Sequence, residues 1–100
     1  MFRDVGIAEE QAVAMISGMA KGGLRPVWTV FSTFIQRTYD QIAQDLCINA
    51  NPAVINVTWG GTASMNDITH ICLFDILMLC SIPGLIYLAP TSCEEYFSML

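Results

Sequence analysis

The sequence predicts an α/β domain of three layers, in which a mainly parallel β-sheet is flanked by helices. Segments with helical spacing alternate along the chain with short β-prone segments, which is the order that a parallel sheet with crossover helices requires. The segment AVINVT, residues 53–58, is close to continuously hydrophobic, as strands covered on both faces are. At 100 residues the chain is expected to form one domain, residues 1–100.

The first half of the chain is expected to contain two helices and one strand. Ala8 to Ala20 carries apolar residues on one helical face, and Gly22-Gly23 follows as a stop signal. A β-prone run, PVWTVF, begins at Pro26, and beyond it Thr33 and Gln36 have the spacing of a capping box for a second helix. The expected inner face of that helix is Ile35, Tyr39, Ile42, Ala43 and Leu46, and its expected end is the segment NANP at 49–52.

The second half is expected to continue, after the strand described above, in a long loop from Trp59 to Thr69. This loop is rich in Gly, Ser, Thr and Asn, and loops of such length in compact domains are often functional. A third helix is expected from about His70 to Cys80, followed by a strand, LIYLA, at 85–89. Thr91 and Glu94 form another possible capping box, for a helix that runs to the last residues.

Charge and hydropathy exclude several classes of function. The net charge is −5 with only four Lys and Arg, so there is no basic patch for nucleic acid. Residues 71–90 have nearly the length of a membrane span, but Asp75 lies within them and Pro83-Gly84 divides them into halves that are too short. No basic signal-peptide region opens the chain. We therefore expect a cytoplasmic protein with no nucleic-acid and no membrane partner.

The apolar composition indicates a protein partner. Because 54% of the residues are hydrophobic and 13% are charged, a chain this short cannot bury all of its apolar side chains. We expect part of its surface to be covered by protein. The cysteines lack the spacing of metal ligands and are expected to be buried free thiols; they are Cys47, Cys72, Cys80 and Cys93.

Two adjacent acids lie where a ligand site is expected. Ligand sites in parallel sheets form at the carboxyl ends of the strands. Glu9 and Glu10 begin the first helix at such a point, and Gly6 frees the backbone before them. Helix dipoles favour acids in the first turn, so both could be surface acids. The alternative is that the pair contributes to a site.

Aromatic and basic residues cluster around the start of the second helix. Phe31 and Phe34 either pack in the core or form a stacking wall for a planar ligand, and Arg37 would be a surface or an ion-paired residue. His70, the only histidine, closes the long polar loop. It is either structural or a proton shuttle.

Three segments of the chain together resemble one family. They are DVGIAEEQAVAMISGMAKGGLRPV at 4–27, FSTFIQRTYDQI at 31–42 and NDITH at 66–70. These segments are similar to the central, pyrimidine-binding domain of 1-deoxy-D-xylulose-5-phosphate synthase, a transketolase-like thiamine diphosphate enzyme. The resemblance covers almost the whole chain and implies the layered α/β fold of that domain.

The resemblance implies roles for one acid of the first helix and for the residues around the start of the second. Glu9 would hydrogen-bond a ring nitrogen of the cofactor's aminopyrimidine and so promote the imino form that takes the proton from the thiazolium carbon. Glu10 has no such role in the family. Phe34 would stack on the pyrimidine ring, and Phe31 stands where the family usually has Tyr. Arg37 would support the pocket electrostatically.

The resemblance also implies that the polar loop binds substrate. His70 matches the His of the family's DGxTH motif, which lies near the substrate and assists proton transfer, and Asn66 or Asp67 replaces the usual Asp. Gln11 replaces the His of the family's AEQH, and Trp59 stands where an Arg usually helps to hold the substrate phosphate. These departures bear on the substrate rather than on the cofactor.

The implied reaction is decarboxylation of pyruvate and transfer of a two-carbon unit to glyceraldehyde 3-phosphate, a step of isoprenoid and thiamine biosynthesis. Two alternatives stay open. One is ketol transfer from a ketose donor, as in transketolase, and the other is a noncatalytic assembly domain of the same fold.

The implied cofactors are thiamine diphosphate and Mg²⁺. In the family a GDG motif of a separate domain holds the metal and the diphosphate, and this chain contains no GDG. The resemblance therefore implies a diphosphate-binding domain, in the same or another chain, as partner within a homo-oligomer. The chain is expected to be part of a larger enzyme and to be inactive alone.

Overall fold

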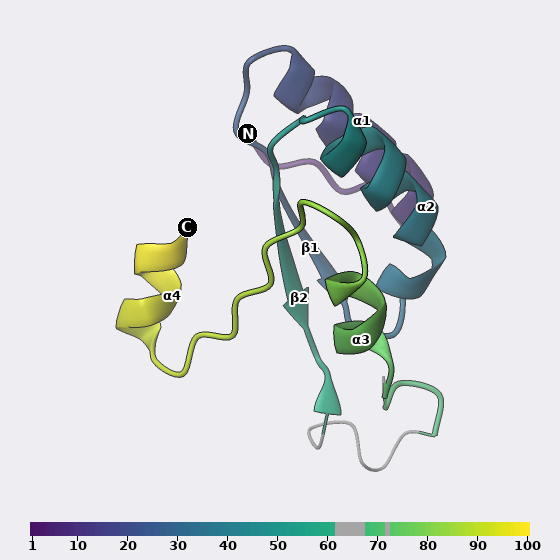
Figure 1. The fold of residues 1–100 in the computed structure, drawn as a ribbon, viewed down its shortest axis with the longest axis vertical. Helices are drawn as coiled ribbons and strands as arrows, with labels where there is room; N and C mark the ends of the chain where they lie inside the picture. The colour runs from purple at the N-terminus through teal and green to yellow at the C-terminus, as the bar shows by residue number, and fades with distance from the viewer. Residues whose placement is uncertain (62–67, 72) are drawn as a thin grey trace.

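The computed structural model describes residues 1–61, 68–71 and 73–100 (Figure 1). Its elements are α1 (Glu9–Lys21), β1 (Val27–Phe31), η1 (Ile35–Thr38), α2 (Tyr39–Gln41), η2 (Ile42–Ile48), β2 (Val54–Thr58), α3 (Asp75–Cys80) and α4 (Cys93–Met99). β1 and β2 pair in parallel, with Val27 opposite Val54 and Phe31 opposite Thr58. The predicted α/β class and the parallel sheet are confirmed.

Helices cover one face of this sheet. Trp28 and Val30 of β1 lie opposite Ile55 and Val57 of β2, and all four pack in or against the buried core. The alternate residues of β1 point the other way, and Val27 among them is 58% exposed. Every residue of β2 is only half-buried. The prediction that this strand is covered on both faces is therefore wrong for the described chain.

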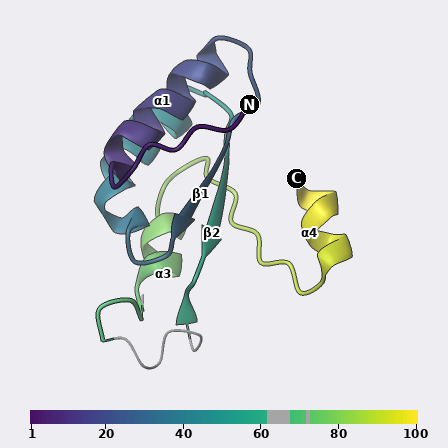
Figure 2. The ribbon, with the colours of Figure 1, turned by 180° about the vertical axis from the view of Figure 1, so that it is seen from behind.

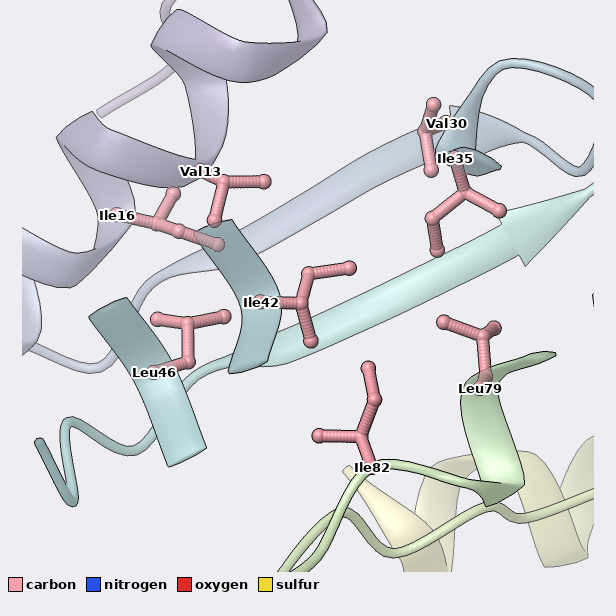
Figure 3. Close-up of a cluster of buried hydrophobic side chains, with 8 residues drawn as sticks. All are labelled: Val13, Ile16, Val30, Ile35, Ile42, Leu46, Leu79 and Ile82. Atoms are coloured by element: carbon pink, nitrogen blue, oxygen red, sulfur yellow. The ribbon is translucent and has the colours of Figure 1, made fainter. Parts of the chain in front are cut away.

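The core is a cluster of buried aliphatic side chains that joins the helices to β1 (Figure 3). Its most enclosed members, Val13, Ile35 and Ile42, are at most 1% exposed. Full burial of a side chain of this kind contributes about 1.5–3 kcal/mol. The complete cluster is Val13, Ile16, Val30, Ile35, Ile42, Leu46, Leu79 and Ile82.

The first helix agrees with its predicted bounds to within one residue at each end. Ala12, Val13, Ile16 and Ala20 form its buried apolar face, because residues three and four apart lie on one side of a helix. Gly23 follows with a φ of +86°, a conformation that residues with a Cβ rarely adopt. This glycine turns the chain back toward β1.

The second predicted helix is present but changes pitch twice. It runs from the 3₁₀ turn η1 through α2 to the π-helical segment η2. Ile35, Ile42 and Leu46 are buried as predicted, and Ala43 is half-buried. Tyr39 is 39% exposed, so its prediction as an inner residue is wrong. Each change of pitch rotates the following side chains away from the 3.6-residue spacing on which the prediction depended.

The predicted capping box of this segment does not form. Gln36 Nε2 donates to the carbonyl of Thr33 at 3.0 Å, and Thr33 Oγ1 donates to the carbonyl of Thr69 at 3.0 Å. The helical segment begins at Ile35, with Phe34 in the N-cap position. Thr33 therefore lies outside the segment, and its hydroxyl makes a tertiary contact instead.

The chain after β2 differs from the prediction in two places. α3 begins at Asp75, so His70 lies in the bend before the helix and not in its first turn. The segment at 85–89 is not a strand, because the described sheet consists of β1 and β2 alone, and Ile86 is 82% exposed. A β-prone segment becomes a strand only where its backbone pairs with a sheet edge, so propensity alone was insufficient here.

The last helix, α4, lies on the other side of the strands from α1 in both views (Figures 1 and 2). None of its residues is buried. Its cap is shifted by one residue from the predicted pair, because Ser92 Oγ accepts from the backbone N–H of Glu95 at 3.1 Å. The Glu95 carboxylate in turn accepts from the backbone N–H and the hydroxyl of Thr91.

The cysteines are more exposed than the sequence predicts. Cys80 and Cys93 are exposed free thiols and Cys47 is half-buried, so the prediction of buried cysteines is wrong for the first two. Cys72 lies outside the described residues.

Within residues 1–61, 68–71 and 73–100, no helix has the length and hydropathy to span a bilayer.

Candidate functional site

A candidate site lies where the carboxyl end of β1 meets the first turn of α1. Glu9 begins α1, Phe31 ends β1, and Phe34 and Arg37 lie in the turn and η1 that follow. The loop segment 68–71 brings His70 to the same place. The structure thus brings together these five residues, which were named from the sequence.

Glu9 is a buried carboxylate with an incomplete set of partners. Its side chain is 10% exposed, and its Oε2 lies 3.4 Å from Arg37 Nη1. The Arg37 side chain is 53% exposed, so the cation approaches from the solvent side. Glu10, its neighbour, is exposed. Burial therefore separates the two adjacent acids that the sequence alone left equivalent.

The second oxygen of Glu9 is available to a ligand. In the part of the chain that the structure describes, only Arg37 hydrogen-bonds to this carboxylate. Gln41 Oε1 is the one fully enclosed side-chain oxygen without a partner there, so Glu9 Oε1 keeps some contact with the outside. Buried carboxylates normally accept several hydrogen bonds, because their desolvation is costly. This position therefore suits a ligand that offers a polar ring nitrogen or N–H group.

Four aromatic rings form a row at the carboxyl end of β1. Phe31 stacks on Trp59 with centroids 5.9 Å apart and on Phe34 with centroids 6.2 Å apart. Phe34 meets the ring of His70 edge to face at 5.2 Å. Phe31 is 44% exposed, so the row has an open side on which a planar ligand can stack.

Trp59 was not recognised from the sequence as a member of this aromatic row. The family resemblance marks Trp59 only as a replacement for an arginine. A signal was present, because in a parallel pair the residue after β2 must lie beside the end of β1, and Phe31 is in register with Thr58. The backbone of Trp59 has a φ of +58°, which the sequence pattern did not indicate.

His70 is held by its neighbour in the chain. Its Nδ1 lies 2.6 Å from Thr69 Oγ1, and the ring is half-buried against Phe34. Asn66 and Asp67, which were predicted to bind substrate, lie outside the described residues, and their roles stay predictions. No group of three His, Cys, Asp or Glu side chains capable of holding a metal occurs among the described residues.

The described side chains fit an aminopyrimidine ring. Such a ring needs a carboxylate for its nitrogen and an aromatic surface for its face. Glu9 Oε1 provides the first, and the open side of the aromatic row provides the second. Arg37 lies one turn after Phe34 of the aromatic row and contacts Glu9, so it connects the row with the carboxylate.

An apolar groove of about 740 Å³ lies elsewhere, between β2, η2 and the segment at 84–90. Among the described residues of its lining there is no Asp, Glu, His, Lys or Arg, so neither Glu9 nor His70 belongs to it. It has the character of a packing surface rather than of a catalytic site. The polar edge of the sheet therefore remains the candidate site.

These features define a small α/β domain with a buried carboxylate and an aromatic surface at the carboxyl edge of a parallel sheet. The family described as "Transketolase, pyrimidine binding domain" matches residues 1–100, and the chain belongs to this family. The resemblance stated from the sequence is thereby confirmed.

The similar curated proteins are 1-deoxy-D-xylulose-5-phosphate synthases. The one from Clostridium tetani is 45% identical over 97 residues, which cover 97% of this chain and 16% of that protein. The one from Desulforudis audaxviator is 41% identical over 99 residues, covering 99% of this chain and 16% of that protein. The one from Clostridium acetobutylicum is 45% identical over 94 residues, which cover 94% of this chain and 15% of that protein. The chain thus spans about 16% of the length of these relatives.

Proposed function

We propose that this domain forms the aminopyrimidine-binding half of a thiamine diphosphate site in a 1-deoxy-D-xylulose-5-phosphate synthase-like transferase. The observation that carries the proposal is the buried Glu9 carboxylate, to which only the half-exposed Arg37 hydrogen-bonds within the described chain. The overall reaction would decarboxylate pyruvate and transfer two carbons to glyceraldehyde 3-phosphate, for isoprenoid and thiamine biosynthesis.

Glu9, Phe31, Phe34 and Arg37 would hold the cofactor's pyrimidine. When bound, the cofactor supplies the electron sink that the reaction needs. Glu9 would accept or donate a proton at Oε1, in a pocket where low exposure strengthens each hydrogen bond. Arg37 would orient the carboxylate through Oε2. Phe34 and Phe31 would exclude water from the ring face.

His70 would move a proton close to the substrate. Its ring lies against Phe34, and Thr69 fixes the orientation of the imidazole through Nδ1. A positioned His is the commonest general acid or base, and such a group contributes about 10²–10⁴-fold to a rate. Asn66 and Asp67 precede it in the chain and would contribute substrate contacts.

A second domain would complete the site. The diphosphate and Mg²⁺ would be held by a diphosphate-binding domain of the same or another chain, within a cytoplasmic homo-oligomer, so this chain alone would be inactive. Exposed apolar side chains such as Val27, Ile86 and Phe97, at 58%, 82% and 72%, support a covering partner.

Titration calorimetry and turnover test the proposal together. Thiamine diphosphate and Mg²⁺ are titrated into the chain alone and into its mixture with a diphosphate-binding domain, and pyruvate decarboxylation is followed. Binding and turnover are expected in the mixture only, and Glu9→Gln is expected to abolish turnover. Glu10→Gln is the matched control, since that acid is exposed.

The result also separates the alternatives. Association of the two proteins without cofactor binding or turnover would show a noncatalytic assembly domain. Turnover with a ketose donor but not with pyruvate would show a transketolase-type ketol transferase, an outcome that the stacking of Trp59 on Phe31 makes worth testing.

A further inference from the structure

Ser32 occupies an enclosed position directly beside the aromatic row. It is 1% exposed and lies in the turn between β1 and η1. Its backbone N–H donates to the carbonyl of Thr58 at 2.8 Å, which extends the sheet pairing by one bond. Its hydroxyl donates to Asp75 Oδ2 at 2.6 Å. Short hydrogen bonds to a carboxylate are about twice as strong as neutral ones.

The close approach of Gly60 confines the Ser32 side chain. A Cβ at position 60 would lie 3.1 Å from Ser32 Oγ and 3.2 Å from Ser32 Cβ, which is tighter than ordinary contacts. The glycine thus allows the chain after β2 to pass directly over the serine. The hydroxyl is directed to Asp75 and has little freedom to turn elsewhere.

Thr33 makes a parallel connection to the same distant segment. Its Oγ1 donates to the carbonyl of Thr69 at 3.0 Å. Adjacent hydroxyls in one turn therefore bind residues 69 and 75, which flank His70. The same turn carries Phe34, the ring on which His70 packs.

We propose that Ser32 and Thr33 are positioning residues, which set the His70 ring against Phe34 by holding the chain at Thr69 and at Asp75. Thr33 acts through Thr69, and Ser32 acts through Asp75. The catalytic meaning of this placement rests on the proposed function, but the placement itself does not. Small displacements of a reacting group are costly, and a 1 Å error can reduce a rate by about 10²-fold.

The placement can be measured without cofactor or turnover. The chain contains one histidine, so the untagged protein gives a single set of imidazole proton resonances in its NMR spectrum. The neighbouring Phe34 ring displaces these resonances from their random-coil positions. Phe34→Leu removes that ring current and defines the zero point.

Four variants test the two anchors. Ser32→Ala and Thr33→Val are each expected to lose most of the His70 displacement, and so is Asp75→Ala. Asp75→Asn is expected to keep it, because the amide oxygen still accepts the Ser32 hydrogen bond. Ser98→Ala, on the exposed helix α4, is the matched control and is expected to change nothing.

Coupling between Ser32 and Asp75 gives a second readout. The double variant Ser32→Ala/Asp75→Ala is expected to lose no more of the His70 displacement than either single variant does. The reason is that each single variant already removes the same hydrogen bond. If Ser32→Ala fails to fold, the half-buried Thr33→Val decides, because it removes a hydroxyl with little change of shape.

Clear outcomes would overturn the proposal. They are an unchanged His70 displacement in folded Ser32→Ala and Thr33→Val, equal losses in Asp75→Asn and Asp75→Ala, or an equal loss in Ser98→Ala. If the chain shows the expected shifts but does not bind thiamine diphosphate even when mixed with a diphosphate-binding domain, this placement stands and only the proposed function is refuted.

Discussion

Glu9 and Arg37 are joined by one carboxylate oxygen at 3.4 Å, with the acid buried and the base largely in solvent. A long, half-exposed ion pair contributes little to stability. In the proposed site, its role would be to orient Glu9 while one oxygen stays available.

Arg37→Met should therefore separate stability from cofactor binding. We expect the free energy of unfolding in urea to fall by less than about 1 kcal/mol, because a long ion pair whose cation is half-exposed contributes only that much. The affinity of the assembled protein for thiamine diphosphate should fall at the same time. Arg25→Met, which removes another exposed arginine, should change neither quantity. A large loss of stability in Arg37→Met would mean that the pair is structural.

The core should be most sensitive at Ile42, which is 1% exposed and lies at the centre of the aliphatic cluster (Figure 3). Ile42→Ala is expected to lower the free energy of unfolding by about 2–5 kcal/mol, through lost burial and a residual cavity. Ile48→Ala, at a residue 71% exposed, is the matched control and should cost less than about 0.5 kcal/mol. Equal effects in urea titrations would contradict the described packing.

Burial raises the pKa of the Cys47 thiol above its ordinary value of 9.0. The raised pKa stabilises the folded state fully below the ordinary value, and this contribution is lost as pH rises through the folded pKa. In a variant whose other three cysteines are Ser, we expect slow reaction with Ellman's reagent at pH 8. The rate should still be rising above pH 9, because the thiolate is the reacting form. A rate that has levelled off by pH 9 would contradict the burial of Cys47.

Hydrogen bonds from the backbone and the hydroxyl of Thr91 lower the pKa of Glu95 from its ordinary value of 4.5. The lowered pKa means that the cap of α4 is favoured above the ordinary value and is lost as pH falls through the folded pKa. NMR titration of the side-chain carboxyl carbon should give a higher pKa for Glu95 in Thr91→Val, which removes the hydroxyl and keeps the N–H. Thr29→Val, far from α4 in the chain, should leave that titration unchanged.

Local structure followed from local sequence for α1, β1 and β2. The periodic apolar face of α1 and the glycines after it predicted that helix to within one residue at each end. The run after Pro26 and the run at 53–58 predicted β1 and β2 and their parallel pairing. These signals act between residues a few positions apart, so they do not depend on the rest of the fold.

The predictions that were wrong depended on distant neighbours. Thr33 has the spacing of a helix cap, yet its hydroxyl bonds Thr69. Residues 85–89 have the composition of a strand, yet they join neither edge of the described sheet. Tyr39 was assigned to the inner face by a regular 3.6-residue spacing that the segment does not keep. In each case the local sequence is compatible with more than one structure, and contacts with distant segments decide which one forms.

The sequence by itself determined the α/β class and the family, and it predicted most of the residues of the candidate site. Only the tertiary structure decided that Glu9 is buried while Glu10 is exposed, that Trp59 joins Phe31, and that Ser32 bonds Asp75. The physical reason is that burial and hydrogen-bond partners depend on segments far apart in the chain. Periodicity and capping signals cannot specify those contacts.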